Sequence, residues 1–125
     1  MKKRKAISLI EVLITVAILT GGIVFVFRSF MTSLSAANLS QNIMLASYLA
    51  EDKLWQVEAA QKQKISLENS GLETVNIQSR EFSTKYEILP TTIKSLSKLN
   101  ISAAWLRDKR NSYSVDFSTY LTPEN

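Results

Sequence analysis

Residues 1–30 read MKKRKAISLIEVLITVAILTGGIVFVFRSF, and this stretch decides the fold. Four cations, Lys2 to Lys5, precede an apolar run from Ile7 to Phe27 that contains one carboxylate, Glu11. A helix of about 20 apolar residues is long enough to span a bilayer. Flanking cations hold their end of such a helix on the cytoplasmic side. The run therefore predicts one membrane-spanning helix, with the rest of the chain on the far side.

Glu11 is the unusual residue of this run. A charge at the centre of a membrane helix costs about 2.5–3.5 kcal/mol on insertion scales, and such residues usually have a function. A carboxylate in hydrocarbon must pair with a cation or take up a proton. The alternative is that Glu11 lies at the membrane surface, where water solvates it.

The residues that lead up to Glu11 resemble the N-terminus of type IV pilins and type II secretion pseudopilins. In that family a short basic leader ends in a small residue, prepilin peptidase cuts after it, and the new N-terminus is methylated. The fifth mature residue is Glu, and here Ile7-Ser8-Leu9-Ile10-Glu11 follows the small residue Ala6. The resemblance implies cleavage between Ala6 and Ile7 and N-methylation at Ile7. Two residues depart from the pattern, because the family usually has Gly at the position of Ala6 and Phe or Met at that of Ile7.

The resemblance also implies a role for Glu11 and a set of partners. In the family this carboxylate pairs with the N-terminal amine of a neighbouring subunit during assembly. The implied partners are other minor and major pseudopilins or pilins, prepilin peptidase, the inner-membrane assembly platform and membrane lipid. The implied location is the bacterial inner membrane, crossed once, with the C-terminal domain in the periplasm before assembly into a pseudopilus or pilus.

Gly21 and Gly22 stand next to each other in the apolar run. Small residues let membrane helices approach closely, and a Gly pair is also a point where a helix bends. The pair is therefore a candidate for helix packing or bending, although Gly is also simply common in membrane helices. Thr15 and Thr20 are tolerated in lipid because their hydroxyl groups bond to helix carbonyls.

The helical pattern continues beyond Arg28 as an amphipathic stripe of apolar residues at steps of three and four: Ile43, Ala46, Ala50, Leu54 and Val57. Neither Pro nor Gly interrupts the chain from Ile23 to Ser70. We therefore expect one helix from Ile7 to about Gln61. It divides into a transmembrane or assembly half, residues 7–28, and a soluble half, residues 29–62, after a leader of residues 1–6.

Residues 63–125 predict a small β domain. Residues 61–74 are expected to form a connection, with a turn at 69–71. Alternating apolar residues then predict three strands, over 80–89, 98–106 and 112–121. One face of each strand is expected to form the face that packs against the helix stripe: Phe82, Thr84, Tyr86 and Ile88; Leu99, Ile101, Ala103 and Trp105; and Tyr113, Val115 and Phe117. The predicted fold is α+β and pilin-like: a long N-terminal helix packed on a three-stranded antiparallel sheet. Trp55 and Trp105 are expected to pack in the core or at its edge.

The C-terminal pattern extends the resemblance. A segment ending in Trp105, a short charged turn over residues 108–111 and the run YSVDFSTYL are similar to the end of the small minor pseudopilin called component I. Related minor pilins share this pattern. The helical stretch LASYLAEDKLWQVE also resembles the corresponding helix of minor pseudopilins.

Composition excludes several classes of function. The 125-residue chain has no Cys and no His, and its formal charge is +4. Without the four cations of the leader, eleven basic residues remain against eleven acidic ones, so the basic balance does not indicate nucleic-acid binding. The missing thiols and imidazoles leave no Ser-His or Cys-His catalytic set. We expect no enzyme activity, no cofactor and no metal site.

Three interpretations follow from the sequence. The first is an assembly subunit: a minor pseudopilin for protein secretion, or a minor pilin for adhesion, motility or DNA uptake. The second is a secreted binding module whose signal peptide is cut near Ala36, although the apolar run exceeds the usual 7–15 residues of such a signal. The third is an interaction domain on a single, uncleaved membrane span. The mature N-terminus distinguishes them: Ile7, a residue near Ala36, or Met1.

Overall fold

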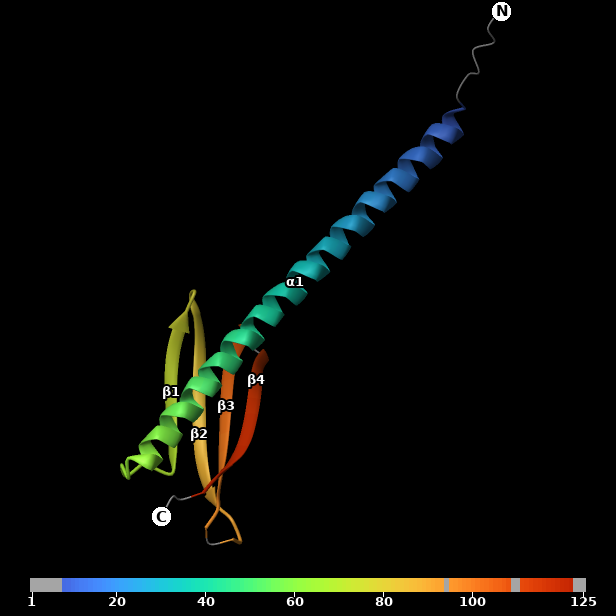
Figure 1. Ribbon diagram of the computed structural model, residues 1–125. Coiled ribbons are helices and arrows are strands. Elements are labelled where there is room, and N and C mark those ends of the chain that lie inside the picture. Colours follow the sequence, from blue (N-terminus) through green and yellow to red (C-terminus); the bar gives the residue numbers. More distant parts are fainter. Residues whose placement is uncertain (1–7, 94, 109–110, 123–125) are drawn as a thin grey trace, which may run out of the picture. The chain divides into compact units, whose positions relative to one another are not determined.

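The computed structural model describes residues 8–93, 95–108 and 111–122 of an α+β chain. It has one helix and four strands (Figure 1): α1 (Leu9–Lys62), β1 (Ser70–Ile77), β2 (Arg80–Pro90), β3 (Ser97–Asp108) and β4 (Asn111–Leu121). The chain divides into two compact units, Met1–Ser40 and Gln41–Asn125. The first unit contains the apolar part of α1, and the second contains the rest of α1 together with the sheet.

The four strands form one antiparallel sheet in the order β1-β2-β3-β4, so each strand pairs with its neighbours in the chain. The predicted three-stranded sheet was therefore wrong by one strand, since β1 occupies part of the expected connection, residues 61–74. Gly, Glu and Asn are depleted in strands, and β1 contains all three. The β1–β2 turn is Gln78-Ser79, with φ values of 50° and 64°. Hairpin turns of this kind usually contain Asn or Gly, so the turn gave no sequence signal.

The three predicted strands are confirmed, with boundaries one or two residues longer at some ends. Their predicted core faces are confirmed for β2 and β3, whose buried residues are Phe82, Thr84, Tyr86, Leu99, Ile101, Ala103 and Trp105. Along β4, Tyr113, Val115 and Phe117 pair with residues of the same face of β3. Lys109 and Arg110, expected in the last hairpin turn, lie outside the described residues.

The second unit is held together by the C-terminal part of α1 lying over one face of the sheet (Figure 1). Ala46, Ala50 and Val57 of the predicted stripe are buried. Two stripe residues differ, because Leu54 is half-buried and Ile43 is exposed, while Asn42 is buried instead. The buried strand residues lie mainly on β2 and β3, so these two strands are the best covered.

Trp55 does not pack in this core. Its side chain is 61% exposed, so its predicted role in core packing was wrong. Trp105, in contrast, is 3% exposed and confirms the prediction. The helix places Trp55 two residues before the buried Val57, and this offset turns its ring toward solvent.

Lys53 joins α1 to the β1–β2 hairpin. Its Nζ lies 2.8 Å from Oε2 of Glu73 on β1 and 5.4 Å from the centre of the Tyr86 ring on β2. The Lys53 side chain is 18% exposed and that of Glu73 is 53% exposed, so water shields this ion pair only in part. This contact holds the β1 edge of the sheet against α1.

Gly71 of β1 makes room for Tyr86, which lies opposite it on β2. A Cβ atom built on Gly71 would lie 2.2 Å from Cε1 and 2.8 Å from Cζ of the Tyr86 ring. The ring is also in contact with Lys53, so it cannot move away freely. Gly71 therefore lets an aromatic side chain cover the sheet edge, a recognised way of compensating for a glycine in a strand.

We expect Gly71→Ala to destabilise the second unit by about 1–3 kcal/mol, because the added methyl group overpacks the Tyr86 ring. Urea unfolding of the full chain in detergent micelles, followed by circular dichroism, measures the effect. The double variant Gly71→Ala/Tyr86→Ala should remove the clash, so its cost should be smaller than the sum of the two single costs. Additive costs would show that the clash is relieved elsewhere.

The helix ends in a Schellman motif with an unusual residue. The N–H of Ile65 donates to the carbonyl oxygen of Ala60 (3.1 Å), and the N–H of Lys64 donates to that of Gln61 (3.0 Å). Lys64 has φ 53°, in the left-handed region where Gly is the usual residue. A side chain at this position carries a steric cost that Gly avoids.

Replacing Lys64 with Gly is therefore expected to stabilise the second unit by about 0.5–1 kcal/mol. The control is Lys64→Ala, which removes the same charged side chain but keeps the Cβ atom. The same urea titration compares both variants with the parent chain. Equal stabilities of the two variants would assign the effect to charge rather than to the backbone.

Candidate functional site

The first unit presents an uncovered apolar surface. Its part of α1 is long and apolar enough to cross a membrane, and none of the most apolar window is buried. The exposed large side chains run from Leu9 to Phe30, and they include Leu13, Ile18, Leu19, Ile23, Phe25 and Phe27. Burial of apolar surface is worth about 25 cal/mol per Å², so this surface favours lipid or other apolar helices over water.

The hydroxyl groups of this helix are compatible with burial in lipid or against other apolar helices. Thr15 donates to the carbonyl oxygen of Glu11 (2.8 Å), and Thr20 donates to that of Val16 (2.7 Å). Thr32 and Ser33 make the same bond to the residues four positions earlier. The prediction that threonines bond to helix carbonyls is thus confirmed for both Thr15 and Thr20. These polar groups are satisfied within the helix and do not need water.

Glu11 lies in the first turn of α1, where the helix dipole favours a negative charge. Its backbone N–H donates to the carbonyl oxygen of Ser8 (2.9 Å), and its side chain is exposed. Among residues 8–40 the only cation is Arg28, seventeen residues further along the helix, or about 25 Å. Within the described part of the first unit, therefore, no cation lies near Glu11.

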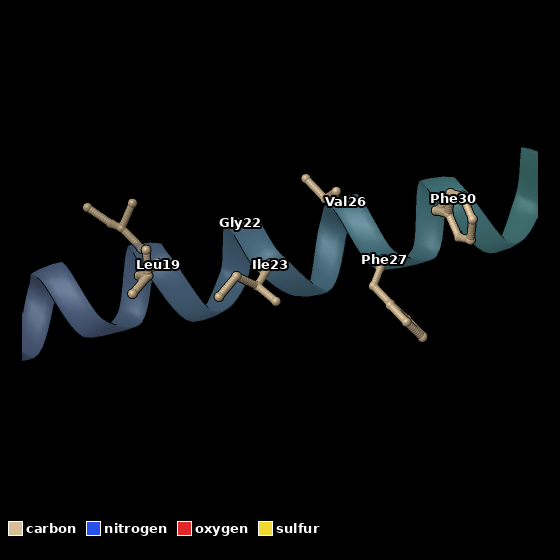
Figure 2. Close-up of a pocket in the computed structure, with 7 residues that line it drawn as sticks. Leu19, Gly22, Ile23, Val26, Phe27 and Phe30 are labelled. Atoms are coloured by element: carbon tan, nitrogen blue, oxygen red, sulfur yellow. The ribbon is translucent and has the colours of Figure 1, made fainter.

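Gly22 forms the floor of a shallow apolar groove on the same helix. Figure 2 shows that large side chains project on both sides of Gly22, where the helix carries none; the groove is lined by Ile18, Leu19, Gly22, Ile23, Val26, Phe27 and Phe30. A Cβ atom added at Gly21 or at Gly22 would meet nothing within 4 Å. The space at both glycines is therefore open, and Gly22 is the one that lies in the groove.

Glu11 and Gly22 lie on one face of the helix. They are eleven residues apart, which is about three helical turns and about 16 Å. The structure therefore does not bring them together into one pocket, but places them on a common line along the helix. Ala6 and Ile7, the predicted processing residues, lie outside the described residues, so cleavage between them stays a prediction.

A second exposed stripe was missed by the sequence interpretation. Met44, Tyr48 and Trp55 are all exposed, although the sequence predicted a single apolar stripe in this part of α1 and placed Trp55 in the core or at its edge. Their spacing of four and seven residues places them on one face, opposite the buried Ala46, Ala50 and Val57. The signal was present in the sequence as a second set of large apolar residues at helical spacing. It was hidden because Glu51, Asp52 and Gln56 alternate with them.

Among the described titratable residues, Lys85, Glu87, Lys98 and Asp116 line one open hollow on the sheet. Within the described ranges, no three acidic side chains lie close enough together to hold a metal ion. Of the two ion pairs found there, Lys53–Glu73 joins α1 to β1, and Lys62–Glu58 lies within the last turns of α1. The expectation that the chain is not an enzyme stays a prediction.

Comparison of the chain with protein-family models, with curated proteins and with solved structures finds no match.

Proposed function

We propose that this chain is a minor pseudopilin of a type II secretion system. Prepilin peptidase removes residues 1–6, and Ile7 is N-methylated. The protein then resides in the inner membrane with its sheet domain in the periplasm. The apolar part of α1 then packs against the corresponding helices of sister subunits. Together these subunits form the tip of a periplasmic pseudopilus that serves protein secretion.

The observation that carries this proposal is the position of Glu11. It is the fifth residue after the proposed cut, in the first turn of an exposed apolar helix, and far from the only described cation of its unit. Cleavage between Ala6 and Ile7 would create a new amine close to it in sequence. Since both charges lie in hydrocarbon, a chain and its neighbour satisfy each other when the amine of one pairs with Glu11 of the other.

Two further features support packing between helices. The space at Gly21 and Gly22 is open, and bulky side chains flank the groove at Gly22. In membranes, where lipid is as apolar as leucine, close packing around small residues is what drives association between helices. Outside the membrane, the stripe of Met44, Tyr48 and Trp55 offers a further apolar surface to a neighbouring helix.

The test is the mass and N-terminal sequence of the protein, purified from membranes with and without a co-expressed prepilin peptidase. We expect a peptidase-dependent start at Ile7 that is heavier by one methyl group. Ala6→Leu should block this cleavage, whereas Ala17→Leu, the same change within the apolar helix, should not. A start at Met1 in both membranes would leave a plain membrane-anchored domain, and a start near Ala36 would indicate an ordinary signal peptide.

A further inference from the structure

The two edge strands of the sheet differ in how they are protected. Edge strands expose unpaired backbone N–H and C=O groups, and proteins usually block them with an inward-pointing charge, a proline or a bulge. Edge strand β1 carries such a charge on its helix-facing side, because Glu73 points toward Lys53 of α1. On β4 the helix-facing residues are Tyr113, Val115, Phe117, Thr119 and Leu121, and none of them is charged.

The helix also leaves β4 less covered than β2 and β3. Phe117 pairs with the buried Ile101 and shares its face, yet the Phe117 side chain is 45% exposed. Beside it runs an apolar groove of about 230 Å³ between the helix and the sheet, lined by Ser47, Ala50, Glu51, Leu54, Leu99, Ile101, Phe117, Ser118 and Thr119. The core of the second unit is therefore open along one side, next to a strand edge whose helix-facing residues carry no charge.

We infer that β4 is a docking edge for an extended segment of a different polypeptide, which adds a fifth strand to the sheet. The backbone of β4 decides the conformation of this partner, since only an extended chain satisfies the N–H and C=O groups of a strand edge. Such a strand would lie about 4.8 Å from β4. Alternate side chains would then fall beside Phe117 and close the groove.

The side chains around β4 indicate which residues the partner segment contains. On the helix side it presents apolar residues, because the groove wall is apolar. On the open side, Asp116 is exposed between Ser114 and Ser118. Opposite charges directly across a strand pair are stabilising. The partner segment therefore alternates apolar residues with polar ones and places a Lys or Arg opposite Asp116.

A second copy of this chain fits the edge poorly. In an antiparallel pair of two β4 strands, related by a two-fold axis along the sheet normal, both Asp116 side chains lie on the same face of the joined sheet. When the strands pair through their middles, these like charges lie close together and destabilise the pair. Parallel pairing about an axis along the strands puts the second helix on the other face, so that Asp116 and the serines of the second β4 would lie beside Phe117. Pairing with β1 of another copy would place Glu73 at the apolar groove.

The test uses the full chain in detergent micelles and a labelled nine-residue peptide that alternates valine with polar residues and has one central lysine. Fluorescence anisotropy gives the affinity, and hydrogen exchange locates the contact. We expect protection of 111–121 and no protection of 70–77. A scrambled peptide of the same composition should bind at least tenfold more weakly, and so should the peptide N-methylated along its pairing edge. Equal binding of these peptides would overturn the inference.

Variants of the protein make the test specific for β4. Phe117→Lys puts a charge on the helix-facing side of β4, as Glu73 does on β1, and should weaken peptide binding at least tenfold. Leu72→Lys, at an exposed apolar residue of β1, is the matched control and should leave binding unchanged. Asp116→Lys should reverse the preference from a central lysine to a central glutamate. Unfolding curves check that each variant keeps its fold, and unchanged binding by a folded Phe117→Lys would contradict the proposal.

The occupant is tested separately. Because the chain has no cysteine, Ser114→Cys gives a single thiol on β4. We expect no disulfide-linked dimer of this variant under mild oxidation. Efficient dimer formation would assign the edge to a second copy and overturn the choice of partner. The peptide experiment does not require pilin-type processing, so failure of the proposed function leaves its outcome intact.

Discussion

Under the proposed function, Glu11→Ala is expected to keep the protein in the membrane but to abolish its association with sister subunits. Removing a charge makes insertion more favourable, by up to about 2.5–3.5 kcal/mol at a helix centre. Removing one partner of a buried ion pair costs about 3–5 kcal/mol, because the other charge is left unpaired. Association should therefore fall by at least about 100-fold, since each 1.4 kcal/mol is a factor of ten.

Co-purification of the tagged protein with the pilin-type subunits of its host measures this effect, at equal membrane levels of each variant. Glu51→Ala is the matched control, since it removes an exposed carboxylate from the same helix outside the apolar part. We expect this control to co-purify like the parent chain. Normal co-purification of Glu11→Ala would argue against the assembly role and return Glu11 to a solvated position at the membrane surface.

Trp105→Ala is expected to destabilise the second unit by about 3–5 kcal/mol, the usual cost of removing a buried large aromatic side chain. Trp105 lies on β3 with its ring centre 6.1 Å from that of Phe82 on β2 and 5.8 Å from that of Tyr113 on β4. One ring thus joins three strands on the helix-facing side of the sheet. A loss of this size is a large part of the total of about 5–15 kcal/mol that holds a domain together.

Thermal unfolding of the full chain in micelles, followed by circular dichroism, gives the loss. The control is Trp55→Ala, which removes the same side chain from an exposed position and should change the stability by no more than about 0.5 kcal/mol. If both variants have melting temperatures close to that of the parent chain, Trp105 does not stabilise the core. A contact with a partner would then be the better role for Trp105.

The pattern of single residues explains which parts of the fold were predictable. Strands β2, β3 and β4 alternate apolar and polar residues, so the period of two was enough to find them and to assign the core faces of β2 and β3. Strand β1 was missed because Gly71 contributes no side chain, and Tyr86 from the next strand fills the space instead. Because the side chain that fills this space belongs to β2, the sequence of β1 alone does not indicate a strand.

The position of the candidate site along the chain was predictable, but what covers the site was not. The sequence placed Glu11 and Gly22 in the apolar helix, and the helical period puts them on one face. What covers that face depends on contacts between chains, which the periodicity of one chain does not encode. The stripe of Met44, Tyr48 and Trp55 was overlooked for a related reason: two apolar faces on one helix were interpreted as one, and the buried one was assumed to be complete.

The consecutive order of the strands has a consequence for how quickly the protein folds. Every strand pairs with the strand next to it in the chain, so the sheet has a low contact order. Domains dominated by local pairings fold faster than those that must first close long loops. During folding, each strand can therefore be added to the one before it. The large aromatic residues of the sheet are then buried early, which shortens the time for which they are exposed to aggregation.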